Sequence, residues 1–240
     1  GEMAALCEIA RPNRALITNI GHAHLEGFGT VDAVAREKSE LVRSVGREGT
    51  FYVNLDDDFC VAIGREFQCR QVTFGTRKSA QWVARVGESR FDPPATTVVI
   101  ERVGSFEVPL IGRHTVMNAV AAVVVALDFG LDRSEIQAGL ETVELPPLRM
   151  RMVQVNSRTF INDAYNANPE SMRAAIETLR GWRQRGRKIA VLGDMLELGD
   201  SSVDEHRSLG AYAAGAGLDV LMVLGTFASY VVEGAISAGM

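Results

Sequence analysis

One polar segment of this chain reads Asn162-Asp163-Ala164-Tyr165-Asn166-Ala167-Asn168-Pro169-Glu170-Ser171. Apolar Phe160 and Ile161 precede it, and apolar residues at helical spacing follow it over residues 172–179. Proline is favoured in the first turn of a helix, so the pattern predicts a strand, a polar loop and a helix that begins near Pro169. Ligands of α/β proteins tend to bind where a strand ends and the next helix begins. A turn that merely caps the helix explains the same residues equally well.

The bulk composition is that of an ordinary globular chain. At 240 residues, with 47% hydrophobic and 23% charged residues, the chain is long enough for one large domain or two small ones. The formal net charge of -5 argues against nucleic acid as the main partner. The longest apolar run, residues 119–127, is far shorter than the roughly 20 residues that a membrane span needs, so we expect no membrane span.

The three cysteines are scattered and odd in number, with neither metal-binding spacing nor a disulfide framework. A reducing compartment, the cytoplasm, is the default expectation for such a chain. The first residues, Gly1-Glu2-Met3, do not resemble a signal peptide, and residues 231–240 end inside an apolar helical pattern. We therefore expect the chain to be a fragment of a longer protein.

The first part of the chain alternates strands with helices and then changes character. Thr30 and Gly46 are suitable caps for a helix over residues 31–45. Between residues 81 and 110, short β-rich pieces separated by Gly and Pro predict an antiparallel excursion. The other predicted elements are strands at 15–20, 50–54 and 72–74 and helices at 56–67, 114–129 and 133–140.

The segment Leu145-Pro146-Pro147-Leu148 marks the predicted boundary between two α/β domains, at residues 1–147 and 148–240. Two consecutive prolines cannot continue a helix, and they stiffen a linker. Beyond them strands and helices alternate again, which implies parallel strands joined by helices. The predicted strands are 152–155, 158–161, 188–192 and 220–224, and the predicted helices are 169–184, 203–216 and a final one.

Two histidines and one lysine near the first predicted strand are candidates for chemistry. His22 and His24 follow that strand, and an imidazole near carboxylates can bind a divalent metal, although solvated loop histidines fit the same pattern. Lys38 lies between Glu37 and Glu40, which is more typical of a solvated helix face.

Further candidates surround two later helix starts. His114 and Asn118 lie four residues apart, hence on one helix face; they could contact a base edge, but capping of the helix is the simpler interpretation. His206 follows a glycine-rich loop and either points back toward it or is a surface histidine. That loop, which fits a ligand site or a tight turn, reads Gly193-Asp194-Met195-Leu196-Glu197-Leu198-Gly199. The sequence contains no Gly-x-x-x-x-Gly-Lys-Ser/Thr phosphate loop.

In this order, the motifs resemble one family across nearly the whole chain, the Mur ligases of peptidoglycan synthesis. The Tyr-Asn-Ala-Asn-Pro and Gly-Asp-Met-x-Glu-Leu-Gly elements resemble the branch that adds D-alanyl-D-alanine to a UDP-N-acetylmuramoyl-tripeptide. The matching segments are Gly1-Glu2-Met3-Ala4, residues 18–26, Ala35-Arg36-Glu37-Lys38, Gly112-Arg113-His114 with Asn118, residues 163–169 and residues 193–199.

The resemblance implies an α/β fold made of the later half of a central ATP-binding domain and the first part of a Rossmann-like C-terminal domain. Family members form an amide: a carboxylate takes the γ-phosphate of ATP, and an amine attacks the acyl phosphate. This implies ATP and Mg²⁺ as cofactors and UDP-N-acetylmuramoyl-tripeptide and D-alanyl-D-alanine as substrates; we expect a monomer. The family's phosphate loop would lie before Gly1, so we expect this chain alone to be inactive.

The resemblance also implies roles for the metal and adenine candidates. His24 would bind one Mg²⁺, and Lys38 matches a lysine that related Mur ligases carry as an N-carbamate. That modification turns a cation into an anion, which explains how a lysine could sit beside a metal. Asn118 and His114 would contact the adenine. Thr115 stands where the family often has asparagine, so the adenine contact depends mainly on Asn118.

The remaining roles fall on residues beyond the proline linker. By the resemblance, Arg149 would contact the ATP phosphates, and Asp163 would accept hydrogen bonds from the ribose hydroxyls. The residues implied near ATP and D-alanyl-D-alanine are Tyr165, Asn166 and Asn168, with His206 on the dipeptide side.

Two other functions fit parts of the sequence. The missing phosphate loop also fits a noncatalytic nucleotide-binding α/β module. A folate-polyglutamate or cyanophycin-type ligase shares the mechanism, but the Tyr-Asn-Ala-Asn-Pro element argues against it.

Overall fold

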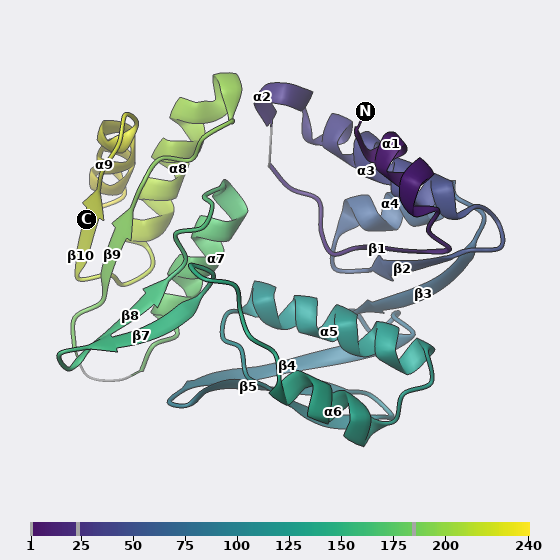
Figure 1. Cartoon of the computed structure of the whole chain (residues 1–240). Helices are drawn as coiled ribbons and strands as arrows, with labels where there is room; N and C mark the ends of the chain where they lie inside the picture. The colour runs from purple at the N-terminus through teal and green to yellow at the C-terminus, as the bar shows by residue number, and fades with distance from the viewer. Residues whose placement is uncertain (1, 23–24, 184–185) are drawn as a thin grey trace.

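The computed structural model describes residues 2–22, 25–183 and 186–240, and Figure 1 shows them as neighbouring groups of helices and strands. The helices are α1 (Glu2–Ala10), α2 (Leu25–Phe28), α3 (Val31–Val45), α4 (Asp58–Glu66), α5 (Arg113–Asp128), α6 (Arg133–Glu141), α7 (Pro169–Arg180), α8 (Ser202–Ala214) and α9 (Ala228–Ser237). The strands are β1 (Arg14–Ile17), β2 (Thr50–Asn54), β3 (Arg70–Gly75), β4 (Trp82–Phe91), β5 (Pro94–Ile100), β6 (Gly104–Val108), β7 (Arg151–Val155), β8 (Arg158–Asn162), β9 (Ile189–Leu192) and β10 (Val220–Val223).

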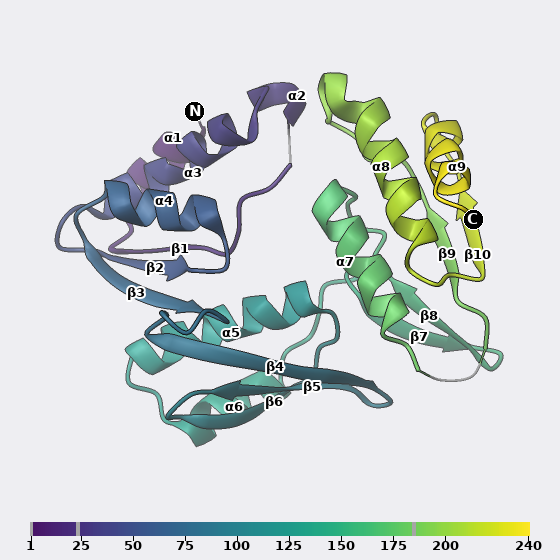
Figure 2. The ribbon, with the colours of Figure 1, turned by 180° about the vertical axis from the view of Figure 1, so that it is seen from behind.

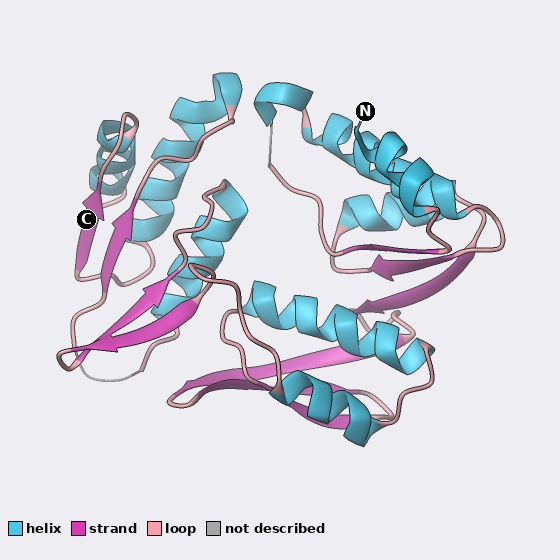
Figure 3. Cartoon of the chain, viewed as in Figure 1, coloured by secondary structure: helices cyan, strands magenta, loops and turns pink. Residues whose placement is uncertain are grey.

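One mixed sheet, in the order β1-β2-β3-β4-β5-β6, runs through the first half of the chain. Strands β1 to β4 are parallel, and β4 to β6 are antiparallel. Helices α3 and α4 cover one face of the parallel part, and α5 covers the other (Figure 2). In Figure 3, α5 and α6 both lie in front of the antiparallel strands. The predicted antiparallel excursion is therefore confirmed, and it extends the parallel sheet.

Strand β2 shows why this sheet needs helices on both faces. All five residues of β2 are buried. Successive side chains of a strand point to opposite faces, so Phe51 and Val53 pack with α3 and α4 while Tyr52 packs with α5. A strand that is buried on both faces is typical of parallel α/β sheets.

Local sequence determines several helix ends as predicted. The Thr30 side chain accepts the N–H of Ala33 at the start of α3, and Gly46, with φ 66°, ends it at the predicted bounds. The sequence pattern does not predict α1 or α2. Helix α2 is a single turn, which is too short for an apolar repeat to be recognised. Helix α7 begins at Pro169 as predicted but ends at Arg180, earlier than expected.

In the described residues of the second half of the chain, the strands form two separate pairs. Strands β9 and β10 are parallel and flank α8 in the chain, as the alternation predicts. Strands β7 and β8 are antiparallel, so the prediction of parallel strands is wrong for this pair. Asn156 and Ser157 join them with φ values of 48° and 60°, the geometry of a tight hairpin turn. A parallel connection needs a dozen or more residues, which this turn does not supply.

Helices α8 and α9 approach each other through glycines. A Cβ atom on Gly210 would lie 1.9 Å from the carbonyl oxygen of Val231, and a Cβ atom on Gly234 would lie 1.9 Å from that of Arg207. The two helices are therefore in direct backbone contact, which only glycine permits at both positions. Among the described residues, no helix is long and apolar enough to cross a membrane.

Asp128, the last residue of α5, joins this helix to three strands. Its carboxylate accepts hydrogen bonds from Arg14 (2.7 Å), from the Tyr52 hydroxyl (2.8 Å) and from Arg70 (2.9 Å). A carboxylate at a helix C-terminus is disfavoured by the helix dipole, and the two guanidinium groups offset this repulsion. The hydrogen bonds from Arg70 foremost, together with those from Tyr52 and Arg14, hold the pKa of Asp128 well below its ordinary value of 3.8.

We expect Asp128→Ala to lower the free energy of unfolding by about 2 kcal/mol at neutral pH, since hydrogen bonds to a charged group are worth about that much. The pKa of Asp128 is depressed in the folded state. Its stabilisation is therefore complete above the ordinary pKa of 3.8 and is lost as the pH falls from there toward the depressed value. Urea unfolding across this pH range measures both effects.

Glu101→Gln is the control, because it breaks an exposed ion pair with Arg85 and should change the free energy of unfolding by less than about 1 kcal/mol. Equal losses in the two variants would contradict the role of Asp128. So would a difference between wild type and Asp128→Ala that does not narrow in acid.

Candidate functional site

Loops that follow strands meet where the two halves of the chain touch. In the loop after β1, the backbone N–H of His22 lies 3.3 Å from both carboxylate oxygens of Glu170, in the first turn of α7. The N–H of Glu26 donates to the carbonyl oxygen of Glu197 (2.9 Å), in the loop after β9. Figure 2 shows this approach, with α2 beside the start of α8. His22 and Glu26 thus contact residues of the second half that are far from them in the sequence.

The loop after β8 is bonded to the linker between the two halves. Tyr165 donates its backbone N–H to the carbonyl oxygen of Leu148 (3.0 Å), and Asp163 Oδ1 accepts the N–H of Met150 (3.0 Å). The Arg149 guanidinium lies 4.1 Å from the centroid of the Tyr165 ring, a cation–π geometry. Leu148 and Met150 have φ values of 64° and 45°, so these bonds hold a strained backbone.

His114, near the start of α5, has a buried ring nitrogen without a partner. The helix begins after Gly112 with no side-chain cap, so the expected capping by His114 and Asn118 is wrong. Nδ1 of His114 makes no hydrogen bond within the described part of the chain. Burial lowers the pKa of His114, and the nearby Asp163 carboxylate opposes this in part. The ring is therefore neutral near pH 7, and because Nδ1 is buried, a ligand could bond to it only after the residues that cover it had moved.

Gly112 allows the linker, α5 and α7 to pack closely. A Cβ atom on Gly112 would lie 3.0 Å from Thr178 Oγ1, and 3.2 Å from both His114 Cε1 and Met150 Cε. Gly112 also has φ 82°, a conformation that favours glycine. Beside this contact, burial raises the pKa of Asp163, and the hydrogen bond from Met150 is the largest effect opposing that rise. Four of the predicted residues, His114, Asp163, Arg149 and Tyr165, thus belong to one cluster.

Two of the other nucleotide and metal candidates lie on α5 and α3, and the third lies outside the residues that the structure describes. Asn118 is exposed on α5, one turn beyond His114. Lys38 is half-buried on α3, and its Nζ donates to the carbonyl oxygen of Asn19 (3.2 Å), in the loop after β1. His24 lies outside the described residues. Lys38 therefore contacts the same loop that carries His24 in the sequence.

The asparagines of the polar segment make local hydrogen bonds, and those of Asn166 and Asn168 bear on the predicted site. Asn168 caps α7: its Oδ1 accepts the N–H of Ser171 (2.8 Å), and the Ser171 hydroxyl accepts the N–H of Asn168 (3.1 Å). Asn166 is exposed, and its Oδ1 accepts the N–H of Ala167 (2.9 Å). Part of this polar composition therefore serves the start of the helix, and the Nδ2 donors of both side chains remain for a ligand.

His206 is fully buried on α8 and supports the loop after β9. Its Nε2 accepts the N–H of Met195 (2.9 Å), its Nδ1 lies 2.6 Å from the Ser202 carbonyl oxygen, and its ring stacks on Phe227. Asp194, in the same loop, accepts two backbone N–H groups just before α9. His206 has no exposed atom to offer a ligand in this arrangement, so its assignment to the dipeptide stays a prediction.

Sequence reasoning missed the contacts made by Glu170 and Met150. An acid in the first turn of a helix is explained well enough by the helix dipole, so Glu170 gave no separate signal. Met150 adjoins a predicted strand and looks like an ordinary core residue. A signal for the first contact did exist, because Gly21 directly before His22 permits another side chain to approach the backbone closely.

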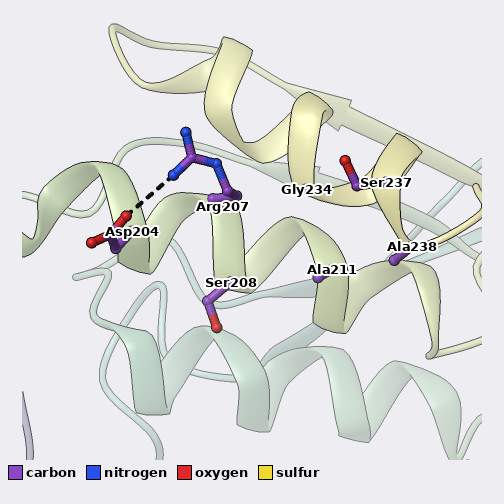
Figure 4. A pocket seen from close by; sticks show the side chains of 7 residues that line it. All are labelled: Asp204, Arg207, Ser208, Ala211, Gly234, Ser237 and Ala238. Carbon is purple, nitrogen blue, oxygen red and sulfur yellow. Dashed lines mark hydrogen bonds and ion pairs between the residues drawn. The ribbon is translucent and has the colours of Figure 1, made fainter.

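Two further observations concern metal ligands and surface hollows. The described residues contain no group of three or more His, Cys, Asp or Glu side chains arranged to hold a metal ion. A surface hollow of about 390 Å³ lies between α8 and α9 and includes none of the predicted site residues (Figure 4). Its lining residues are Asp204, Arg207, Ser208, Ala211, Gly234, Ser237 and Ala238.

Comparison with known families gives two matches along the chain. The Mur ligase middle domain matches residues 1–126, and the Mur ligase, glutamate ligase domain matches residues 148–237. The first match alone covers more than half of the 240 residues. The chain belongs to the Mur ligase family.

Within this family, the chain is similar to individual ligases of known sequence or structure. The UDP-N-acetylmuramoyl-tripeptide--D-alanyl-D-alanine ligase of Bacillus subtilis is 32% identical over 238 residues, which cover 98% of this chain and 51% of that protein. A crystal structure of MurF from Acinetobacter baumannii has 37% identity and a TM-score of 0.87, covering 97% of this chain and 51% of that one. MurF ligase from Thermotoga maritima in complex with ADP has 27% identity and a TM-score of 0.82, covering 96% and 53%. The chain spans about half the length of these relatives.

We expect His114 to titrate below the ordinary histidine pKa of 6.5 because its ring is buried. Asp163→Asn should lower this pKa further, since it removes the carboxylate that favours the charged ring. Ring-proton NMR of the 240-residue chain between about pH 4 and pH 8 measures the midpoint.

Asp132→Asn is the matched control: Asp132 caps α6 and is not among the groups that shift His114. The interpretation of the cluster is wrong if the His114 midpoint stays the same or rises in Asp163→Asn.

Proposed function

We propose that this chain forms the ATP-binding and C-terminal portions of a ligase that joins D-alanyl-D-alanine to UDP-N-acetylmuramoyl-tripeptide. The tripeptide carboxylate takes the γ-phosphate of ATP, and the dipeptide amine then displaces phosphate from the acyl phosphate to form the amide. One observation carries the proposal: 98% of the chain aligns with a ligase of that name at 32% identity. The enzyme would serve peptidoglycan synthesis in the cytoplasm, and we infer domains at residues 1–147 and 148–240.

A nucleotide at the junction is supported by the chemistry of the residues there. The exposed carboxamide of Asn118 can bond to an adenine edge, and the buried, unpaired Nδ1 of His114 would join it only if the cover over that atom opened. The half-buried carboxylate of Asp163 can accept the ribose hydroxyls while Oδ1 keeps its bond to the linker. Arg149, stacked on Tyr165, presents a planar donor suited to phosphate oxygens. The T. maritima relative is a complex with ADP, which supports nucleotide binding by this chain.

The dipeptide and metal assignments are less complete. The loop next to this junction contains Tyr165, Asn166 and Asn168. We assign these three residues to the region that binds ATP and D-alanyl-D-alanine. The described residues do not by themselves fit a Mg²⁺ ion, because no three candidate ligands are grouped. Lys38 as an ammonium cannot bind a metal, whereas its N-carbamate could. The binding of Mg²⁺ by His24 and carbamylated Lys38 therefore stays a prediction.

Two alternatives remain distinguishable by experiment. A noncatalytic nucleotide-binding module would bind ATP but form no product. A folate-polyglutamate or cyanophycin-type ligase would use other acceptors, and the Tyr-Asn-Ala-Asn-Pro element at residues 165–169 argues against it.

The direct test is a ligation assay on the complete enzyme that carries this chain. With ATP, Mg²⁺, UDP-N-acetylmuramoyl-tripeptide and D-alanyl-D-alanine, we expect one ADP and one phosphate for each amide formed. Omission of the dipeptide should abolish amide formation. Nucleotide binding without product would favour the noncatalytic module, and product only with a folate or an acidic polypeptide and an amino acid would favour the other ligases.

We expect Lys38→Ala in the complete enzyme to lower kcat roughly tenfold to a hundredfold, the range seen when a supporting metal-site group is lost. Small carboxylic acids should restore part of the rate, because they can replace the carbamate. Lys78→Ala, which removes an exposed lysine elsewhere, is the control and should leave kcat unchanged. Wild-type kinetics in Lys38→Ala would exclude the carbamate.

A further inference from the structure

The carboxylate of Glu170 crosses from α7 to the backbone of the loop after β1. Its oxygens each lie 3.3 Å from the N–H of His22, and the His22 ring Nδ1 contacts Oε1. Glu170 and His22 are 148 residues apart in the sequence and lie on opposite sides of the linker. The contact therefore joins the two halves of the chain and gives the loop a fixed neighbour on α7.

Gly21 makes this approach possible. A Cβ atom at this position would lie 3.0 Å from Cδ of Glu170 and 3.2 Å from both carboxylate oxygens. Gly21 is not among the glycines with positive φ, so its backbone conformation is open to other residues. Glycine is needed here for space, and the space is filled by the Glu170 carboxylate.

A second contact is made by helix α2, which follows this loop in the sequence. The N–H of Glu26 donates to the carbonyl oxygen of Glu197 (2.9 Å), and Gly199 packs closely enough that its Cβ would lie 3.7 Å from Cα of Glu26. The two contacts thus tie His22 to helix α7 and Glu26 to the loop after β9, two different elements of the second half of the chain.

We propose that Glu170 is a positioning residue that clamps the loop after β1 against α7. In the ligase this would hold that loop, with Lys38 bonded to its Asn19 carbonyl, in register with the polar segment at residues 163–168. Its effect on catalysis rests on the proposed function, whereas the clamp is a property of the chain itself. Reactive groups on two separate elements need such a register, because small misplacements strongly lower the rate.

The clamp is modest in strength. The side chains of His22 and Glu170 are 42% and 47% exposed, and a polar contact between side chains exposed to that degree changes an equilibrium by up to about fivefold. A contact of this size can select one arrangement of the loop without contributing much to the stability of the fold.

Hydrogen exchange in the 240-residue chain tests the clamp directly. In Glu170→Ala, the amide of His22 should exchange up to about fivefold faster, because it loses its acceptor. Glu170→Gln keeps one acceptor oxygen and should have a smaller effect. Glu177→Ala is the matched control: it removes the same charge from α7, but Glu177 bonds to Tyr212 and Arg180 within the second half of the chain. Unchanged His22 exchange in Glu170→Ala would overturn the proposal.

A double-mutant cycle tests the consequence for catalysis in the complete enzyme. Glu170→Ala should lower kcat up to about fivefold while the unfolding midpoint stays unchanged. Gly21→Ala should do the same through its clash with the carboxylate, and adding it to Glu170→Ala should have no further effect. Fully additive losses of kcat, or a lowered unfolding midpoint that accounts for the loss, would overturn the positioning role.

The two experiments separate the clamp from the proposed function. If the unsubstituted enzyme forms no amide, the proposed ligase activity fails, and the exchange of His22 still decides whether the clamp exists. If amide forms normally and the exchange rate of the His22 amide is the same in wild type and Glu170→Ala, only the clamp fails.

Discussion

Close packing around Gly112 is the constraint on which the relation between the two halves of the chain depends. Here α5 begins, α7 passes with Thr178, and the linker contributes Met150, all against a residue without a side chain. Helix α7 also meets the first half at both ends. Its first turn contacts the loop after β1, and just beyond its last turn Trp182 packs edge-on against Phe91, with ring centroids 4.7 Å apart. Contacts along one whole helix define how the loops on either side face each other.

The polar residues of the strand-end loops divide into two groups. Asn168, Asp194 and His206 hold backbone N–H groups and thereby fix the course of their loops. Arg149 and Tyr165 are exposed and open to a ligand. A loop at a ligand site must satisfy its own backbone before it can bind anything, so a dense polar motif serves structure and binding at once. The capping and ligand-binding interpretations of the segment at residues 162–171 are therefore compatible.

Sequence reasoning succeeds where the signals are local. The bounds of α3 follow from Thr30 and Gly46, and Pro169 marks the start of α7, because caps act within a few residues. It fails for the β7–β8 pair, where a tight turn with two non-glycine residues at positive φ is hard to recognise. The approach of His114 to Asp163 depends on how the two halves pack, which no local pattern specifies. Family resemblance supplied the remaining roles, because chemistry alone left them open.

The glycine contact between α8 and α9 has a mechanical consequence. With backbone touching backbone at Gly210 and Gly234, neither helix can turn about its axis or slide by one residue without driving a side chain into its partner. Two helices packed in this way form one rigid unit. Because His206 on α8 bonds to Met195, and Asp194 accepts the N–H groups just before α9, the loop after β9 is attached to that unit at both helices.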